Sequence, residues 1–82
     1  MAKYEYQVCQ AQNAAVTFVN GKWQGEVPMA QLSGPQEIAD HCPKVWEYLN
    51  DAGLESWELV SVTLEDFEHG RIMMLYLKRQ IS

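Results

Sequence analysis

The sequence has few cysteines, few basic residues and no long apolar run. Two cysteines in 82 residues do not make the disulfide framework of a small secreted domain, which usually has about four or more. They indicate free thiols in a reducing compartment. No stretch approaches the ~20 apolar residues of a membrane span, and the N-terminus lacks the apolar core of a signal peptide. We therefore expect a soluble cytoplasmic protein.

Acidic residues outnumber basic ones. Six Lys and Arg against eleven Asp and Glu give a net charge of −5 at pH 7. Phosphate binding relies on clustered Lys and Arg, so we expect no nucleic acid partner. For the same reason we expect no binding to anionic membranes. The simplest effect of the charge is solubility.

The chain is short. Its 82 residues make one domain, residues 1–82, and a chain of this length buries only about 60–65 % of its unfolded surface. Domains below about 80 residues are usually reinforced by disulfides, a metal, oligomerisation or unusually good packing. Because cysteines are few and no set of metal ligands is evident, self-association is the reinforcement that we expect.

The first segment is typical of a β-strand. From Lys3 to Ala11, Tyr4, Tyr6 and Val8 alternate with mostly polar residues, and this period of two predicts a strand with one buried face. Aromatic and β-branched residues favour the same structure. The tyrosines would then face the core, and Cys9 would lie on the polar side.

Asn20-Gly21 stands between two apolar-rich segments, Val16 to Val19 and Lys22 to Gln24. This dipeptide is the strongest short-range hairpin signal, because both turn residues need positive φ. A second geometry also fits, in which one long, bent strand has a bulge at the glycine. The sequence leaves both geometries open.

A loop is expected from Gly25 to Gly34, since Pro28 cannot pair within a strand ladder and the segment ends in turn chemistry. Ser33 followed three residues later by Gln36 fits a capping box. We therefore expect a short helical piece near residues 36–41.

The main helix is expected from about Cys42 or Pro43 to Ala52, because proline is tolerated at the first helical position. One continuous helix kinked at Pro43 is the alternative. Gly53 suits the left-handed position just past a helix end, and Leu54 would then pack back on the last turn. Apolar residues at helical spacing form one stripe: Cys42, Val45, Trp46, Leu49 and Ala52.

Two more strands are predicted, from Trp57 to Phe67 and from Ile72 to Arg79, with Gly70 at positive φ in the turn between them. Either a bulge shifts the phase of the first of these strands or both of its faces are covered. The reason is that strict alternation divides its apolar residues, with Val60, Val62 and Leu64 on one face and Trp57 and Leu59 on the other.

The run from Ile72 to Leu77 is apolar without interruption. An antiparallel strand with one wet face should alternate, so both faces of this strand should be covered. We predict an α+β fold, β-β-α-β-β, in which a four-stranded, mainly antiparallel sheet has its main helix on one face. A second copy would cover the other face through Ile72 to Leu77, sheet against sheet or edge to edge. The expected partner is therefore the chain itself, as a homodimer or higher oligomer.

Four motifs follow one another along the chain: Tyr4-Glu5-Tyr6-Gln7-Val8, Lys22-Trp23-Gln24-Gly25, Leu49-Asn50 with Gly53 and Trp57-Glu58-Leu59-Val60-Ser61-Val62, and Leu77-Lys78-Arg79. In this order they resemble a family of small bacterial domains of unknown function. Members of that family usually have glycine before the tryptophan, where this chain has Ser56, and their segment corresponding to 26–42 is shorter. The resemblance implies the β-β-α-β-β arrangement and brings no catalytic or ligand residues.

His41 and Cys42 are adjacent, with Cys9 and His69 elsewhere. A zinc site needs Cys and His ligands in tetrahedral geometry, and no paired ligand motif is present. A Cys–His nucleophile pair needs converging side chains, whereas sequence neighbours at a helix start point apart. We expect Cys42 in the core, His41 in solvent, and no Cys9–Cys42 disulfide because Cys9 lies on the polar side of its strand.

The remaining candidate groups are acidic and aromatic. We interpret Glu55, Glu58, Glu65, Asp66 and Glu68 as a solvated face and turn without ligand-loop spacing. A second set could line a pocket but more often packs in a core: Trp23, Trp46, Tyr48, Trp57 and Tyr76.

We therefore assign no catalytic, cofactor-binding or metal-binding residue. The function that we expect is a non-enzymatic, homo-oligomeric interaction or accessory module. The alternative is a small-ligand-binding protein or an enzyme, with its pocket between helix and sheet or at the subunit interface. His41, a carboxylate and Cys42 converging on a cavity would favour the alternative.

Overall fold

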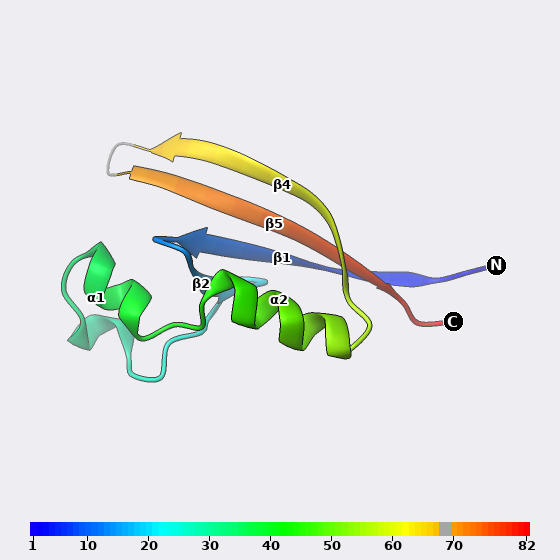
Figure 1. The fold of residues 1–82 in the computed structure, drawn as a ribbon, viewed down its shortest axis with the longest axis horizontal. Coiled ribbons are helices and arrows are strands. Elements are labelled where there is room, and N and C mark those ends of the chain that lie inside the picture. The colour runs from blue at the N-terminus through cyan, green and yellow to red at the C-terminus, as the bar shows by residue number, and fades with distance from the viewer. Residues whose placement is uncertain (68–69) are drawn as a thin grey trace.

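The computed structural model describes residues 1–67 and 70–82. Over these residues the chain forms one antiparallel sheet of five strands in the order β3-β2-β1-β5-β4, with both α-helices between β3 and β4 (Figure 1). The elements are β1 (Tyr4–Gln12), β2 (Ala15–Val19), β3 (Lys22–Trp23), a 3₁₀ turn (Met29–Gln31), α1 (Pro35–Asp40), α2 (Val45–Leu54), β4 (Glu58–Phe67) and β5 (Gly70–Gln80).

The predicted α+β class and antiparallel sheet are confirmed, and the sheet has one strand more than expected. The extra strand is β3, which pairs with β2 across the turn at Asn20-Gly21. Asn20 and Gly21 have φ of 50° and 81°, the pair of positive values that a type I′ hairpin turn requires. The hairpin geometry is therefore correct and the bulged-strand geometry is not.

The two helices are separate. Pro43 lies between them, and the residue before a proline disfavours helical φ and ψ, so the continuous kinked helix is excluded. The helix α2 begins at Val45, two or three residues later than the expected start at Pro43 or Cys42. Its start is fixed to the sheet by hydrogen bonds from the Val16 N–H to the Pro43 carbonyl at 2.8 Å and from the Val45 N–H to the Ala14 carbonyl at 2.9 Å.

The predicted capping box is wrong. Gly34 is the N-cap of α1 and makes no side-chain cap bond. Ser33 instead donates to the Glu37 carboxylate, from its N–H at 3.3 Å and its hydroxyl at 3.2 Å. The residue at the first helical position is Pro35, whose fixed φ starts the helix without a side-chain cap.

The end of α2 differs from the prediction. The helix continues through Gly53 and Leu54, and the left-handed residue is Ser56, with a φ of 72°. The Trp57 N–H reaches back to the Ala52 carbonyl at 3.0 Å, which closes the last turn from beyond Ser56. Leu54 points to solvent and is 86 % exposed, so it does not pack back on the helix.

The buried face of β1 is the opposite of the predicted one. Gln7, Cys9 and Ala11 are buried, whereas Tyr4 and Tyr6 are exposed. Small side chains at Cys9 and Ala11 let a helix approach the sheet closely, which tyrosines would prevent. The alternation correctly predicted which residues share a face of the strand, but it did not predict which face is buried.

A bulge in β4 explains its divided apolar pattern. The register with β5 shifts between Leu59 and Ser61, and a one-residue shift moves the following side chains to the other face. The phase-shift alternative is therefore correct. Because of the shift, three apolar residues of β4 share the side that faces α2. Each lies opposite an apolar residue of β5: Leu59 opposite Leu77, Val62 opposite Leu75 and Leu64 opposite Met73.

The core has two parts. The larger one joins Cys9, Ala11, Val16, Ala52, Leu75 and Leu77, with Val45, Tyr48, Leu49 and Trp57 packed against it. The smaller one joins Ala15, Ala39 and Cys42, with Trp23 beside it. The predicted helix stripe is thus partly wrong, because Cys42 precedes α2 and Trp46 is 59 % exposed, while Tyr48 packs on the sheet.

Candidate interaction surface

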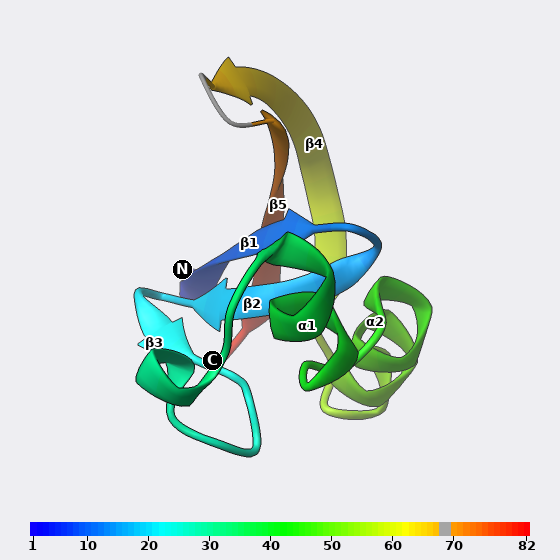
Figure 2. The ribbon, with the colours of Figure 1, turned by 90° about the vertical axis from the view of Figure 1, so that its left-hand side faces the viewer.

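The strand β4 forms one edge of the sheet. Among the described residues it pairs with β5 alone, and none of its ten residues is buried. Its C-terminal end stands clear of both helices (Figure 2). A long strand in this position exposes both its backbone edge and its side chains.

On the side that faces α2, the apolar side chains of β4 lack cover. Leu59, Val62 and Leu64 are 43 %, 45 % and 57 % exposed, whereas Leu75 and Leu77 on β5 are 1 % exposed. A helix about 10 Å wide covers about two strands that lie ~4.8 Å apart. The helix α2 packs on the core formed with β1, β2 and β5 and also contacts β4, but it leaves these three side chains of β4 about half exposed.

On the other side of the hairpin, Ile72, Met74 and Tyr76 are partly exposed. Both edges of β5 are paired, one with β1 and the other with β4. The apolar run Ile72 to Leu77 therefore has one face buried under α2, through Leu75 and Leu77, and one face without a covering helix among the described residues.

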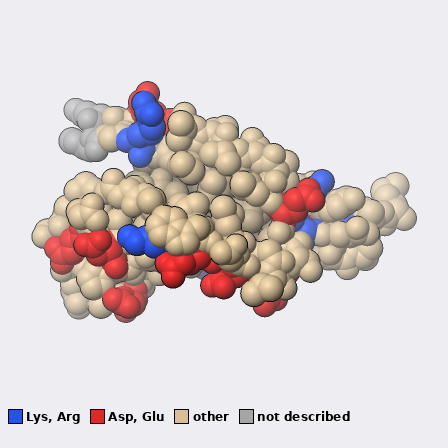
Figure 3. All heavy atoms as spheres, viewed as in Figure 1, with Lys and Arg blue, Asp and Glu red and all other residues tan. Residues whose placement is uncertain are grey.

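Charges lie at the two ends of the β4–β5 hairpin. Asp66 contacts Arg71 at 2.8 Å near the turn, and Glu58 contacts Lys78 at 3.9 Å near the other end. The surface between these pairs shows no Lys, Arg, Asp or Glu in Figure 3. On the face of the hairpin seen there the middle is uncharged, whereas Glu65, opposite Ile72, is an exposed carboxylate between the two pairs.

A groove of about 290 Å³ lies between the start of α2 and the hairpin, where the alternative function would place a pocket. It is lined by Val45, Leu64, Met73 and Arg71, together with residues 11–14 of the β1–β2 turn. Arg71 is already paired with Asp66. The groove is mostly apolar, with Gln12, Asn13 and Arg71 as its polar lining, and it continues the uncovered side of β4 at Leu64.

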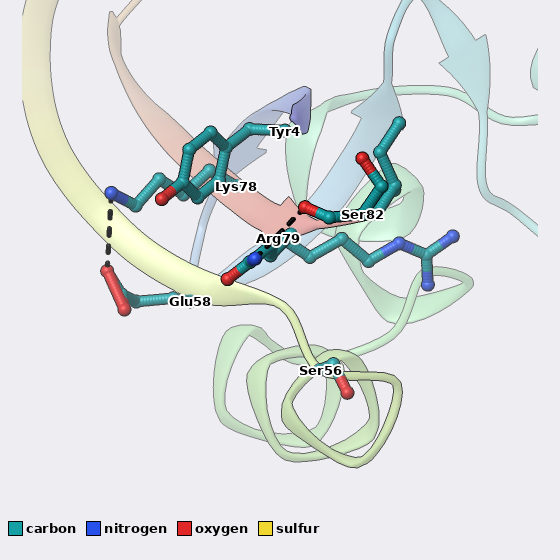
Figure 4. Close-up of a pocket in the computed structure, with 8 residues that line it drawn as sticks. Tyr4, Ser56, Glu58, Lys78, Arg79 and Ser82 are labelled. Atoms are coloured by element: carbon teal, nitrogen blue, oxygen red, sulfur yellow. Dashed lines mark hydrogen bonds and ion pairs between the residues drawn. The ribbon is translucent and has the colours of Figure 1, made fainter. Parts of the chain in front are cut away.

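A larger, open cavity of about 660 Å³ lies where the two ends of the chain meet (Figure 4). Lys78 and Arg79 extend from β5 in opposite directions in this view. The guanidinium of Arg79 pairs with the Glu5 carboxylate, donates to the Glu55 carbonyl at 3.0 Å and lies 4.5 Å from the Trp57 ring centroid. These contacts hold Arg79 in a structural role, fixing the end of α2 to β1 and β5.

The residues that could have formed a nucleophile site do not converge. The Nδ1 atom of His41 lies 2.8 Å from the Glu26 carboxylate in an exposed pair. Cys42 is buried against Ala15 and Ala39, and burial raises the pKa of its thiol. A buried thiol with a raised pKa is a poor nucleophile. His69, the other histidine, lies outside the described residues.

Cys9 belongs to a buried polar cluster that the sequence analysis missed. The Gln7 side-chain oxygen accepts hydrogen bonds from the Tyr48 hydroxyl and from the Cys9 thiol, the latter at 3.3 Å. Burial raises the pKa of both the Cys9 thiol and the Tyr48 hydroxyl. The groups of this cluster are uncharged and hydrogen-bonded to one another, which is typical of a structural role. Both cysteines are free, although Cys9 faces the core, contrary to the prediction.

The other candidates are dispersed. Glu55, Glu58, Glu65 and Asp66 are exposed, Glu68 lies outside the described residues, and among the described residues no group of three His, Cys, Asp or Glu could hold a metal ion. The aromatic residues do not line a common cavity. Tyr48 and Trp57 pack on the larger core part and Trp23 on the smaller one.

In comparisons with known protein families, curated proteins and solved structures, nothing matches this chain. The resemblance to the small bacterial domains therefore stays a prediction. In the part of the chain that the structure describes, no helix is long and apolar enough to cross a membrane.

Proposed function

We propose that the protein is a non-enzymatic interaction module that works as a homo-oligomer, and that copies associate through the β4–β5 hairpin. One observation carries the proposal: Leu59, Val62 and Leu64 are about half exposed beside the buried Leu75 and Leu77. Contiguous apolar surface of this kind on a small chain is typical of an association site.

The free energy to be gained by covering these side chains is large compared with the stability of a small domain. Burying an aliphatic side chain completely contributes about 1.5–3 kcal/mol, so three half-exposed residues leave several kcal/mol unused in the isolated chain. Domains of ordinary size have only about 5–15 kcal/mol of stability in total. A partner that covers β4 therefore supplies reinforcement that a domain of this length needs.

The proposed surface is wider than the predicted strand Ile72 to Leu77. Because β5 lies inside the sheet, it contributes side chains but no free edge. Met74 and Tyr76 can take part from one face of the hairpin, and the aliphatic residues of β4 from the other. Of the two strands of the hairpin, β4 is the one with an edge that no described strand pairs with.

Paired leucine substitutions test the proposal. Leu64→Lys puts a charge on the proposed surface, and Leu54→Lys puts the same charge at an exposed position at the end of α2. Light scattering should give the unmodified chain and Leu54→Lys at least twice the chain mass of 9.4 kDa, and Leu64→Lys a mass near 9.4 kDa. Equal masses for all three proteins would contradict the proposal.

The groove beside Leu64 and Met73 favours a second candidate, a module that binds a small apolar ligand. Its volume of about 290 Å³ is near the lower end of the usual range for ligand pockets, about 300–1,000 Å³. An apolar fluorescent dye should bind with one-to-one stoichiometry and lose its site in Met73→Trp, which fills the groove. Absence of stoichiometric dye binding would dismiss this candidate.

A further inference from the structure

Among the described residues, no strand pairs with the outer backbone edge of β4. Such an edge presents a row of unpaired N–H and C=O groups, and natural proteins usually block it with Lys, Pro, a bulge or short length. The ten residues from Glu58 to Phe67 include no Lys, Arg or Pro. The bulge of β4, between Leu59 and Ser61, lies near its start, so regular strand continues from Ser61 to Phe67.

The opposite edge of the sheet, formed by β3, is protected against pairing. There β3 has two residues, one of which is Lys22, so both short length and charge discourage pairing. Of the described strands, β4 is therefore the one that offers a partner an open edge.

We infer that two copies of the chain pair β4 with β4, antiparallel and edge to edge, around a two-fold axis at Thr63, so that their sheets become one. The inference rests on the self-association proposed above and adds its geometry. A two-fold axis uses the same surface of both copies, and an open antiparallel edge is complementary to itself in this way.

The apolar pattern selects the register. Residues directly opposite each other in an antiparallel pair share a face. With Thr63 on the axis, Val62 of each copy lies opposite Leu64 of the other copy, and both belong to the side that faces α2. Each half-exposed aliphatic side chain then gains an aliphatic neighbour at the point where its own sheet ends.

The neighbouring registers align fewer aliphatic residues. An axis at Val62 would place Leu64 opposite Val60, and the bulge between Leu59 and Ser61 takes Val60 out of the regular ladder. An axis at Leu64 would place the carboxylate of Asp66 opposite the aliphatic Val62, whereas the axis at Thr63 places Asp66 opposite the bulge. With the axis at Thr63, Glu65 lies opposite the small polar Ser61.

The charges near this edge are otherwise neutralised within the chain. Glu58 has Lys78 at 3.9 Å, and Asp66 has Arg71 at 2.8 Å. Both bases belong to β5, on the inner side of β4, so they do not occupy the open edge. Two copies can therefore approach along β4 without bringing unpaired carboxylates together at the axis.

Cysteine cross-linking tests the register. A residue on the axis lies opposite itself, within the Cα separation of about 4.4–6.8 Å that a disulfide allows, so Thr63→Cys should form a covalent dimer under mild oxidation. Ser61→Cys and Glu65→Cys, each alone, place their thiols about 14 Å apart and should not. A mixture of these two variants should form the mixed dimer, because Ser61 and Glu65 lie opposite each other.

The unmodified chain is the control, because Cys9 and Cys42 are buried and should give no cross-link. Faster cross-linking of Val62→Cys or Leu64→Cys than of Thr63→Cys would overturn the register. A chain that is oligomeric by light scattering, yet cross-links from no position of β4, would overturn edge pairing while self-association stands. A monomeric chain would overturn both.

Discussion

Leu59 and Leu77 lie directly opposite each other on neighbouring strands, yet Leu77 is 1 % exposed and Leu59 is 43 % exposed. Both side chains project to the side where α2 packs. The difference arises because α2 packs on the core that contains Leu77, whereas its contact with β4 leaves Leu59 only partly covered. The same difference separates Val62, which is 45 % exposed, from Leu75 opposite it, which is 1 % exposed.

The left-handed residue after α2 gives a first prediction. Ser56 has a φ of 72°, a conformation that costs residues other than glycine roughly 1–2 kcal/mol. Ser56→Gly should therefore raise the free energy of unfolding by about 1 kcal/mol, measured in denaturant at fixed protein concentration. As a control, Glu55→Gly changes a residue with φ of −96° and should bring no gain. A loss of stability in Ser56→Gly would refute the assigned helix end.

Gly53 gives a second prediction. Replacing a glycine at a helix end usually destabilises a protein, whereas replacing this one should stabilise it. It lies within α2, has no positive φ, and a Cβ there would meet no atom within 4 Å. Gly53→Ala should stabilise the fold by about 0.5–1 kcal/mol. Gly21→Ala is the matched control, since Gly21 has equal space but a φ of 81°, and it should destabilise. Loss of stability in both variants would show that Gly53 is left-handed.

The buried hydrogen bonds of Gln7 give a third prediction. Tyr48→Phe removes one of the two donors to its side-chain oxygen while keeping the ring that packs on the sheet. The remaining donor is Cys9, so the cost should be about 1 kcal/mol, that of one net hydrogen bond. Thermal or chemical denaturation measures it. Tyr6→Phe, at an exposed position, should change nothing, and equal effects in the two variants would contradict the cluster.

The two buried thiols and the Tyr48 hydroxyl give a prediction about the pH dependence of stability. Burial raises the pKa of the Cys9 and Cys42 thiols and of the Tyr48 hydroxyl above their ordinary values. The unfolded chain therefore releases these protons at lower pH than the folded chain, so stability is constant below the ordinary thiol pKa of 9.0 and falls as pH rises above it. Denaturation between pH 7 and 10 measures this, and rising stability over that interval would contradict the burial.

The same burial predicts slow thiol chemistry. In the folded chain at neutral pH both cysteines should react slowly with a thiol reagent, and both should react at ordinary rates once the chain is unfolded. Quantitative thiol titration with and without denaturant distinguishes the two states. One fast-reacting thiol in the folded chain would show that Cys9 or Cys42 is accessible.

Local chemistry predicted part of the fold well. Asn20-Gly21 signalled its turn because positive φ at two successive residues is nearly specific to such pairs. The division of α1 from α2 was predictable because Pro43 restricts the residue before it. The uncovered side of the sheet was also foreseen in outline, since the chain has too few helices to cover both faces of the run Ile72 to Leu77.

Other features depend on contacts between distant segments. Alternation in β1 cannot tell which face a helix will cover, and here the small side chains of Cys9 and Ala11 decided it. Trp46 and Tyr48 both fit a helical stripe, and only the position of α2 over the sheet selects Tyr48. The exposed edge of β4 depends on strand order, which the sequence does not contain in any local pattern.

Sedimentation equilibrium of the unmodified chain across the micromolar range tests the central claim most directly. We predict a mass of twice 9.4 kDa or more that falls towards 9.4 kDa on dilution, as expected when association covers the open side of β4. A mass of 9.4 kDa at every concentration would contradict the claim, and β4 would then be an exposed edge in the working protein.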